Sequence, residues 1–169
     1  NKTGQVSRQE VFDILSFALH NGIHMLDTAQ SYGESQEIIG QFICKNKSLF
    51  KIVSKFSLHT SSADNQNSKT QCLITLNKLN VDSLYGYLIH SFDDFKRNPA
   101  IWDELVELKS KKLVNKIGIS LYFPEDLEFF LKQSLVPDIV QFPYNIFDRR
   151  FSVFLELLKS QGIELHSRS

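Results

Sequence analysis

Short apolar runs alternate with longer amphipathic stretches along the whole chain. The runs begin near residues 23, 51, 84, 116, 138 and 163, and each has the length of a buried strand. Between them apolar residues recur every three or four positions, as Val11, Leu15 and Leu19 do, which is typical of helices that bury one face. The pattern predicts strands over residues 23–27, 51–56, 84–90, 116–120, 138–142 and 163–166.

Several short signals mark where the predicted helices begin and end. Ser7 and Glu10 have the spacing of a capping box, and Asn21-Gly22 suits the end of that first helix. Proline is favoured in the first turn of a helix, so Pro99 and Pro124 predict two further starts. Other helices are expected after Ser35, across Leu73–Leu79 and over residues 151–160, whereas residues 57–68 are predicted to form a long loop.

Each predicted strand except the last is followed by a helix, which is typical of a parallel sheet with right-handed crossovers. Two architectures fit this alternation, an open doubly wound sheet and a (β/α)8 barrel. The chain has no G-x-G-x-x-G turn after a strand, which disfavours a dinucleotide-binding doubly wound sheet. Polar residues end strand after strand, as they do at the catalytic face of a barrel. We therefore predict a single barrel-type domain over residues 1–169.

Composition narrows the functional classes. The 169-residue chain is 42% apolar, has a formal net charge of zero and a pI near 7.1, so it carries no charge signature of a nucleic-acid or anionic-membrane partner. No apolar run is long enough to span a membrane. Cys44 and Cys72 form neither a CxxC pair nor a disulfide framework, which favours the cytoplasm. Four histidines lack metal-ligand spacing, so no metal is expected: His20, His24, His59 and His166.

Each of three successive predicted strands carries, at or near its end, a residue able to take part in proton transfer. Asp27 ends the first strand, Lys55 lies near the end of the second, and His90 ends the third. Because the carboxyl ends of parallel strands meet at one mouth of a barrel, Asp27 and Lys55 are expected to form an ion pair. Tyr32, five residues after Asp27, is expected to lie over that pair. The sequence thus predicts one site built from these four side chains.

Tyr32 is the candidate proton donor of this site. A free tyrosine has a pKa near ~10, and lowering it to ~7 takes about 4 kcal/mol. One ammonium group at ~4 Å supplies about that much at an effective dielectric constant of ~20. We therefore predict that Lys55 lowers the pKa of Tyr32, that Tyr32 acts as a general acid, and that His90 positions the accepting oxygen or relays the proton.

Five segments in this order resemble the aldo-keto reductase family over almost the whole chain. They are Asp27-Thr28-Ala29-x-x-Tyr32-Gly33 with Ser35 and Gly40, Ser54-Lys55, Leu88-Ile89-His90, Lys116-Ile117-Gly118-Ile119-Ser120, and Gln141-Phe142-Pro143-Tyr144-Asn145. The resemblance implies an oxidoreductase that reduces an aldehyde or ketone to an alcohol. In it, Asp27, Tyr32, Lys55 and His90 form a catalytic tetrad. Hydride comes from a nicotinamide, usually NADPH with NADH possible, and the proton comes from Tyr32.

The same resemblance implies residues that bind the cofactor. Ser120 and Gln141 would hydrogen-bond the nicotinamide carboxamide, and Arg168 stands where many members stack an aromatic ring on the nicotinamide. Leu121 replaces the asparagine that usually follows the serine, and Gln36 replaces the usual glutamate of the signature. The family has eight strands and the chain predicts six. We therefore expect an incomplete (β/α)8 barrel of about six units, truncated at both ends, without the equivalents of strands 1 and 8.

Other interpretations of the same residues stay open at this point. Taken singly, Asp27 fits a helix cap or turn, Lys55 a lysine that extends its amine to the surface, and His90 a core histidine. The chain also fits a regulatory or non-catalytic protein that keeps the reductase fold, since fold does not fix function. A third reading is a lyase that forms a Schiff base through Lys55, which requires a neutral lysine. The carbonyl substrate and the oligomeric state do not follow from the sequence.

Overall fold

A computed structural model describes residues 6–47, 50–58 and 67–168 as alternating strands and helices. The strands are β1 (Met25–Asp27), β2 (Lys51–Phe56), β3 (Leu84–Ile89), β4 (Val114–Ser120), β5 (Ile139–Pro143) and β6 (Glu164–Arg168). The helices are α1 (Arg8–His20), α2 (Ser35–Asn46), α3 (Ser68–Leu79), α4 (Phe92–Arg97), α5 (Ile101–Ser110), α6 (Pro124–Lys132), the 3-10 helix η3 (Arg150–Phe154) and α7 (Leu155–Ser160).

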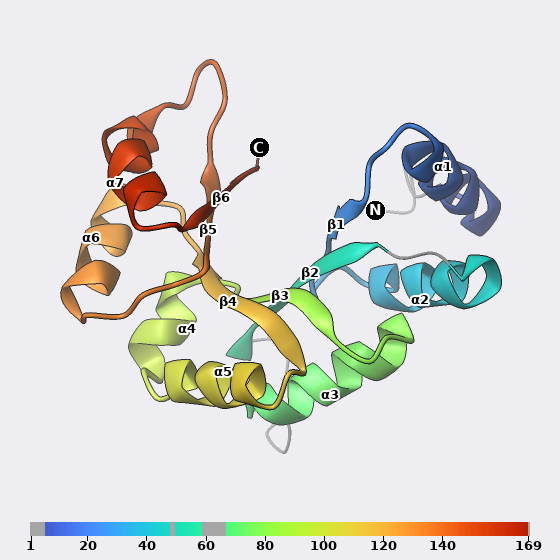
Figure 1. Ribbon diagram of the computed structural model, residues 1–169, viewed down its shortest axis with the longest axis horizontal. Coiled ribbons are helices and arrows are strands. Elements are labelled where there is room, and N and C mark those ends of the chain that lie inside the picture. The colour runs from blue at the N-terminus through green and yellow to red at the C-terminus, as the bar shows by residue number, and fades with distance from the viewer. Residues whose placement is uncertain (1–5, 48–49, 59–66, 169) are drawn as a thin grey trace.

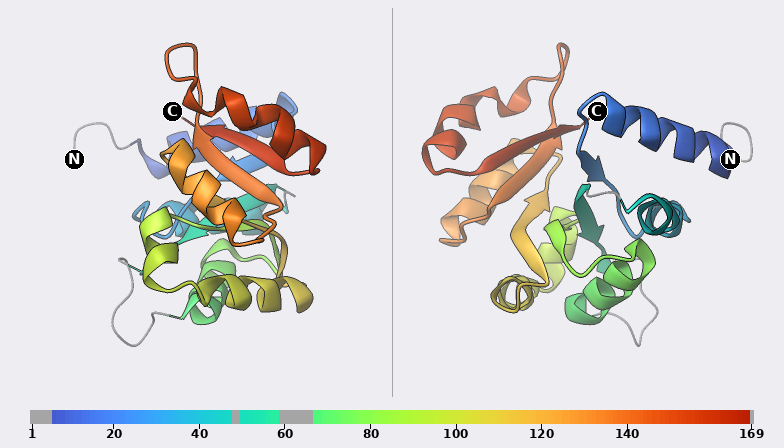
Figure 2. Two further views of the ribbon diagram at one scale, coloured as in Figure 1. Left: turned by 90° about the vertical axis from the view of Figure 1, so that its left-hand side faces the viewer. Right: turned by 45° about the vertical axis from the view of Figure 1, so that its right-hand side comes forward.

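The strands form one parallel sheet whose spatial order is the order of the sequence, β1 to β6. Backbone pairing keeps consecutive strands adjacent, for example Lys55 beside Leu88 and Gln141 beside His166. Figures 1 and 2 show the sheet curved, with helices on its outer, convex side and with β1 and β6 at its two ends. This arrangement is a curled half-barrel, so the predicted incomplete (β/α)8 fold is confirmed and the doubly wound alternative is wrong.

Two separate apolar clusters bury the sheet. The larger cluster lies between the strands and the helices and includes Ile52, Tyr87 and Trp102. The smaller one consists of Val53, Leu88 and Ile139 with the partly buried Tyr85, on the concave side. Burial on both faces explains why the strands are nearly continuous apolar runs rather than alternating ones. It also forces polar side chains of the concave side toward the ends of the strands.

Local signals place most helix ends correctly. Ser7 caps α1 as predicted, with its backbone N–H donating to Glu10 Oε2 at 2.7 Å and its side chain accepting from Glu10 N. Pro124 lies in the first turn of α6, as predicted. The prediction for Pro99 is less accurate, because α5 begins at Ile101. The predicted loop 57–68 lies mostly outside the described residues, and its last residue, Ser68, already belongs to α3.

Helix α4 is an element that the apolar spacing does not reveal. Its six residues are too few for a helical repeat to show in the sequence. Ser91 caps it by accepting a hydrogen bond from Asp94 N, and Phe92 and Phe95 anchor it in the core. The helix directly follows His90 and therefore fixes where the chain leaves β3. In the described part of the chain, no helix combines the length and apolar character needed to cross a membrane.

Candidate active site

An ion pair between Asp27 and Lys55 forms the centre of the site. Lys55 Nζ donates to both carboxylate oxygens, at 2.7 and 2.6 Å, and to the carbonyl of Thr28 at 3.1 Å. The Lys55 side chain is 1% exposed, whereas that of Asp27 is 41% exposed. Asp27 ends β1 and Lys55 lies near the end of the adjacent β2, so the parallel pairing brings the two charges together. The predicted ion pair is therefore present.

Tyr32 and His90 lie beside this pair. Lys55 Nζ is 5.2 Å from the centre of the Tyr32 ring, and the rings of Tyr32 and His90 meet edge to face at 6.0 Å. His90 Nδ1 is also 3.4 Å from Ser31 Oγ, a long contact between the first loop and the end of β3. Tyr32 is half-exposed. The structure thus brings together all four residues that the sequence predicts for proton transfer.

The electrostatics of Tyr32 differ from the prediction. Burial and the nearby Asp27 carboxylate raise the pKa of Tyr32, and the positive charge of Arg168 opposes them. Lys55 does not produce the predicted lowering of the Tyr32 pKa, because its charge is paired with Asp27. Burial also lowers the pKa of Lys55, and the hydrogen bond that Lys55 donates to Asp27 opposes this. The prediction of an acidified Tyr32 is wrong for the protein without bound ligand: this hydroxyl stays protonated near neutral pH.

His90 is in its neutral form near neutral pH. Burial lowers the pKa of His90, and the Lys55 charge lowers it further. A neutral imidazole carries one N–H donor and one acceptor nitrogen. One nitrogen is close to Ser31, so the ring can direct the other toward the site. This geometry suits a group that orients an incoming oxygen atom.

Ser120 ends β4, Gln141 lies in the middle of β5, and both are buried on the concave side. They pair with each other in register across the two strands. Gln141 Nε2 donates to Asp27 Oδ1 at 3.1 Å, so Gln141 joins the Asp27–Lys55 ion pair from the opposite side of the half-barrel. Its Oε1 atom is buried and has no hydrogen-bond partner among the described residues. A free amide oxygen of this kind fits an N–H donor from a ligand.

Arg168 ends β6 and extends back toward β4. Its guanidinium carbon lies 3.9 Å from the centre of the Tyr122 ring, and Nη2 donates to the carbonyl of Leu121 at 3.3 Å. The Leu121 side chain is fully buried and its N–H donates to Gln141 O at 2.8 Å. Leu121 therefore interacts with its polar neighbours only through its backbone. Arg168 is one of the charges that act on Tyr32, Lys55 and His90.

A buried amide network holds the loop that carries Tyr32, and the sequence analysis missed it. Gln30 Nε2 donates to Gln71 Oε1 at 2.8 Å and to Thr75 Oγ1 at 3.1 Å on α3. Gln36 Nε2 donates to Ser54 Oγ at 2.9 Å, beside Lys55. The signal was present, since Gln36 falls on the apolar face of α2. From the sequence, Gln36 is noted only as a replacement for the usual glutamate of the signature.

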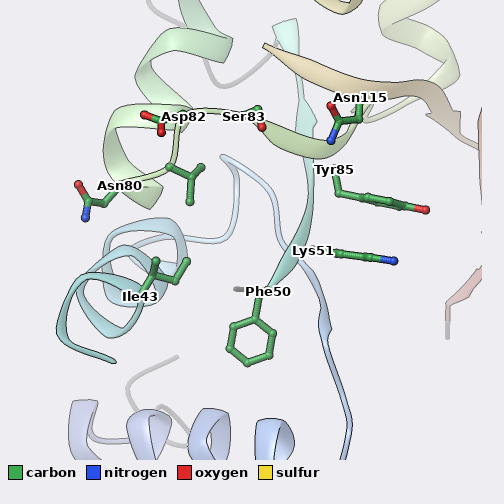
Figure 3. A pocket seen from close by; sticks show the side chains of 9 residues that line it. Ile43, Phe50, Lys51, Asn80, Asp82, Ser83, Tyr85 and Asn115 are labelled. Atoms are coloured by element: carbon green, nitrogen blue, oxygen red, sulfur yellow. The ribbon is translucent and has the colours of Figure 1, made fainter. Parts of the chain in front are cut away.

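A cavity of about 590 Å³ lies at the other end of the strands, away from these residues. Figure 3 shows Ile43, Asn80 and Asp82 along one side of it, with the side chains of Lys51 and Tyr85 extending the opposite way. On the concave side, Glu164 accepts hydrogen bonds from Tyr85 at 2.7 Å and from Lys116. This end of the half-barrel therefore holds the hydrogen-bonded side chains of Tyr85, Lys116 and Glu164, and none of the predicted catalytic residues.

The model of the Aldo/keto reductase family matches residues 1–169, and the chain belongs to this family. Among curated proteins it is 30% identical over 134 residues to the chloroplastic pyridoxal reductase of Arabidopsis thaliana, covering 70% of this chain and 36% of that protein. It is 24% identical over 140 residues to the methylglyoxal reductase DkgA of Escherichia coli, covering 80% of this chain and 49% of that protein.

Solved structures show the same fold. An aldo-keto reductase of Pseudomonas aeruginosa superposes with a TM-score of 0.82 at 24% identity, covering 96% of this chain and 64% of that one. One from Klebsiella pneumoniae, crystallised with NADP and acetate, has a TM-score of 0.77 at 20% identity, covering 98% of this chain and 60% of that one. The chain thus spans less than half of these curated relatives and less than two thirds of these structures.

Proposed function

We propose that the protein is an NADPH-dependent oxidoreductase that reduces an aldehyde or a ketone to an alcohol. The observation that supports this most strongly is the ion pair between the buried Lys55 and Asp27, with Tyr32 and His90 beside it, on the concave side of a half-barrel. The family membership supports an oxidoreductase, and relatives are crystallised with NADP and NADPH. The substrate is a small carbonyl compound that approaches the exposed face of Tyr32.

In this proposal Tyr32 gives the proton. Its raised pKa keeps the hydroxyl protonated, so the donor is present before the substrate binds. As the carbonyl oxygen gains negative charge, the Tyr32 proton moves to it, and the Lys55 cation lies 5.2 Å from the ring to stabilise the tyrosinate. Asp27 keeps Lys55 charged and in place. Neutral His90 offers an N–H that orients the carbonyl oxygen.

The chain supplies residues that fit the nicotinamide end of the cofactor. The unpartnered Gln141 Oε1 suits the amide N–H of a carboxamide, and Ser120 lies next to Gln141 in register. We propose that these two residues hold the carboxamide and that Arg168 contacts the bound cofactor from β6. When bound, NADPH supplies the hydride that reduces the carbonyl carbon.

The test is an assay of the full-length protein with NADPH or NADH and 4-nitrobenzaldehyde. Oxidation of the nucleotide is followed by absorbance, and the nitrobenzyl alcohol is identified by chromatography. The proposal predicts stoichiometric alcohol formation, with NADPH preferred. A protein that is inert toward a broad panel of aldehydes and ketones would contradict it and favour a regulatory or non-catalytic role.

A Schiff-base lyase is less well supported by the geometry. Such a mechanism needs a neutral lysine with a free nitrogen lone pair. Lys55 Nζ instead faces three acceptor oxygens, two of Asp27 and one of Thr28, all within 3.1 Å. Borohydride treatment in the presence of a carbonyl compound should therefore leave Lys55 unmodified, and trapping of the substrate on Lys55 would reverse this conclusion.

A further inference from the structure

One threonine of α3 is hydrogen-bonded to residues on both sides of Tyr32. Thr75 Oγ1 accepts from Gln30 Nε2 at 3.1 Å and, over a longer distance of 3.4 Å, from Gln36 Nε2. These two glutamines lie two residues before and four residues after Tyr32. Thr75 is fully buried and Gln36 is 1% exposed, so the contact between them is shielded from water. A single hydroxyl on a helix thus holds both flanks of the loop.

The same two glutamines also contact the strand that carries Lys55. Gln36 Nε2 donates to Ser54 Oγ at 2.9 Å, one residue before Lys55. The backbone N–H of Gln30 donates to the Lys55 carbonyl at 3.4 Å. The threonine therefore belongs to one network that joins α3, the loop and β2. This network links the two segments whose separation sets the distance of 5.2 Å between the Tyr32 ring and Lys55 Nζ.

Tyr32 depends on such support because its side chain is only partly enclosed. It is 47% exposed, and its ring lies 5.2 Å from Lys55 Nζ and 6.0 Å from the His90 ring. The place of its hydroxyl therefore follows the backbone of the loop. A misplacement of about 1 Å can lower the rate of a reaction between positioned groups about a hundredfold.

We propose that Thr75 is a positioning residue for the reduction: its hydroxyl holds the loop in the place from which Tyr32 delivers the proton, without touching substrate or cofactor. This inference rests on the proposed reductase function. It predicts that the hydroxyl of Thr75, rather than the volume of its side chain, determines kcat. Valine has the branched shape of threonine without the oxygen, and serine keeps the oxygen without the methyl group. The two substitutions therefore separate hydroxyl from volume.

The experiment measures kcat and KM with 4-nitrobenzaldehyde and NADPH for full-length wild type, Thr75→Val and Thr75→Ser. NADP⁺ affinity is measured by calorimetry, and the melting temperature of each protein is recorded. We expect Thr75→Val to lower kcat about tenfold, with KM for the aldehyde and NADP⁺ affinity within about twofold of wild type. Thr75→Ser should keep kcat within about twofold, although the lost methyl group lowers its melting temperature.

Two controls separate this role from a general loss of stability. Thr70→Val makes the same exchange at an exposed position of α3 and should leave kcat unchanged. Leu158→Val changes a fully buried side chain of α7 and should lower the melting temperature with kcat unchanged. Wild-type kcat in Thr75→Val would overturn the proposal. An equal fall of kcat in Thr75→Val and Thr75→Ser, or in Thr75→Val and Leu158→Val, would overturn it as well.

Hydrogen exchange tests the same proposal independently of activity. Exchange of the backbone amides of residues 28–34 is followed by mass spectrometry in the full-length protein. We expect it to be about tenfold faster in Thr75→Val than in wild type or Thr75→Ser. Equal exchange in the three proteins overturns the positioning role, whatever kcat does.

The two proposals fail in different ways. If the wild type reduces no aldehyde, the reductase function has failed, and hydrogen exchange alone then decides whether Thr75 holds the loop. If Thr75→Val does not fold, Gln30→Met takes its place, because it removes one of the two donors to the same hydroxyl. It should lower kcat and speed exchange of residues 28–34 in the same way, and wild-type values of both would overturn the proposal.

Discussion

Lys55 and Asp27 occupy very different environments although they form one ion pair. The lysine side chain is 1% exposed and the aspartate side chain is 41% exposed. A buried charge that loses its partner is strongly destabilising, whereas a charge in contact with water is not. The two residues therefore contribute to the protein in different ways: Asp27 makes it possible to bury Lys55, and Lys55 provides the charge that we propose stabilises the tyrosinate of Tyr32.

We predict that removing Asp27 costs more stability than removing Lys55. Asp27→Ala leaves the buried Lys55 with only the Thr28 carbonyl and should lower the free energy of unfolding by about 2 to 4 kcal/mol. Lys55→Met leaves Asp27 with Gln141 and water and should cost less than about 1 kcal/mol. Urea titrations of both variants measure this, and equal losses or the reverse order would contradict it.

The lowered pKa of His90 predicts a dependence of stability on pH. Burial lowers this pKa in the folded protein, so the unfolded chain takes up a proton first as the pH falls below ~6.5. Stability contributed by His90 is therefore present above pH ~6.5 and is lost as the pH falls through the lower folded value. Urea midpoints at about pH 7.5 and 5.5 should drop more for wild type than for His90→Gln. An identical drop in the two proteins would contradict the buried, neutral histidine.

At the scale of elements, α2 and α3 support the loop that carries the proposed proton donor. The loop between β1 and α2 carries Tyr32, and Gln30 within it is bonded to Gln71 and Thr75 of α3. Thr28 and Ser35, at the two ends of the loop, share a hydrogen bond of 2.9 Å between their hydroxyls. The position of Tyr32 therefore depends on how closely the two helices pack.

Gly40 sets that distance, and we predict that Gly40→Ala destabilises the protein. A Cβ at this position would lie 2.1 Å from the backbone carbonyl oxygen of Lys78, which a backbone group cannot easily avoid. The loss should be about 1 to 3 kcal/mol, although alanine favours a helix. The neighbouring exposed position provides the control, since Gln41→Ala should change stability by less than about 0.5 kcal/mol. Thermal melts compare the two, and a neutral Gly40→Ala would show that the helices can separate.

The elements that the sequence predicts well are those whose signal is local. Strand positions follow from apolar runs, and the start of α1 follows from Ser7 and Glu10. Helix α4 has only six residues and depends on tertiary anchoring by Phe92 and Phe95, so its pattern is not visible in sequence. The role of Gln36 was missed for a related reason: a side-chain amide has no periodicity, and its partner Ser54 is distant in the chain.

At the scale of the whole molecule, the four predicted residues lie close together, whereas the predicted lowering of the Tyr32 pKa is wrong. The order of the strands along the sheet is the order in the sequence, so residues at or near the ends of β1, β2 and β3 lie side by side. Whether the Tyr32 pKa is raised or lowered depends on the balance of burial, Asp27 and Arg168. That balance is a sum over residues from both ends of the sheet, and no single motif determines it.

Strands β1 and β6 form the two edges of the sheet and are far apart in the sequence, yet residues from both contribute to the same site. Asp27 closes β1, and Arg168 closes β6. Gln141 on β5 joins them by donating to Asp27 at 3.1 Å. The half-barrel therefore combines the proposed proton donor with the residues proposed to hold the nicotinamide. Curvature of the sheet, rather than proximity in sequence, makes this possible.

The central claim is that Tyr32 donates the proton, and Tyr32→Phe tests it most directly. The measurement is kcat for NADPH oxidation with 4-nitrobenzaldehyde in the full-length wild type and variant, together with NADP⁺ affinity and the melting temperature of each. The account predicts that kcat falls about a thousandfold, while NADP⁺ affinity and melting temperature stay the same, because only a half-exposed hydroxyl is lost. A Tyr32→Phe variant that retains the wild-type kcat would contradict it.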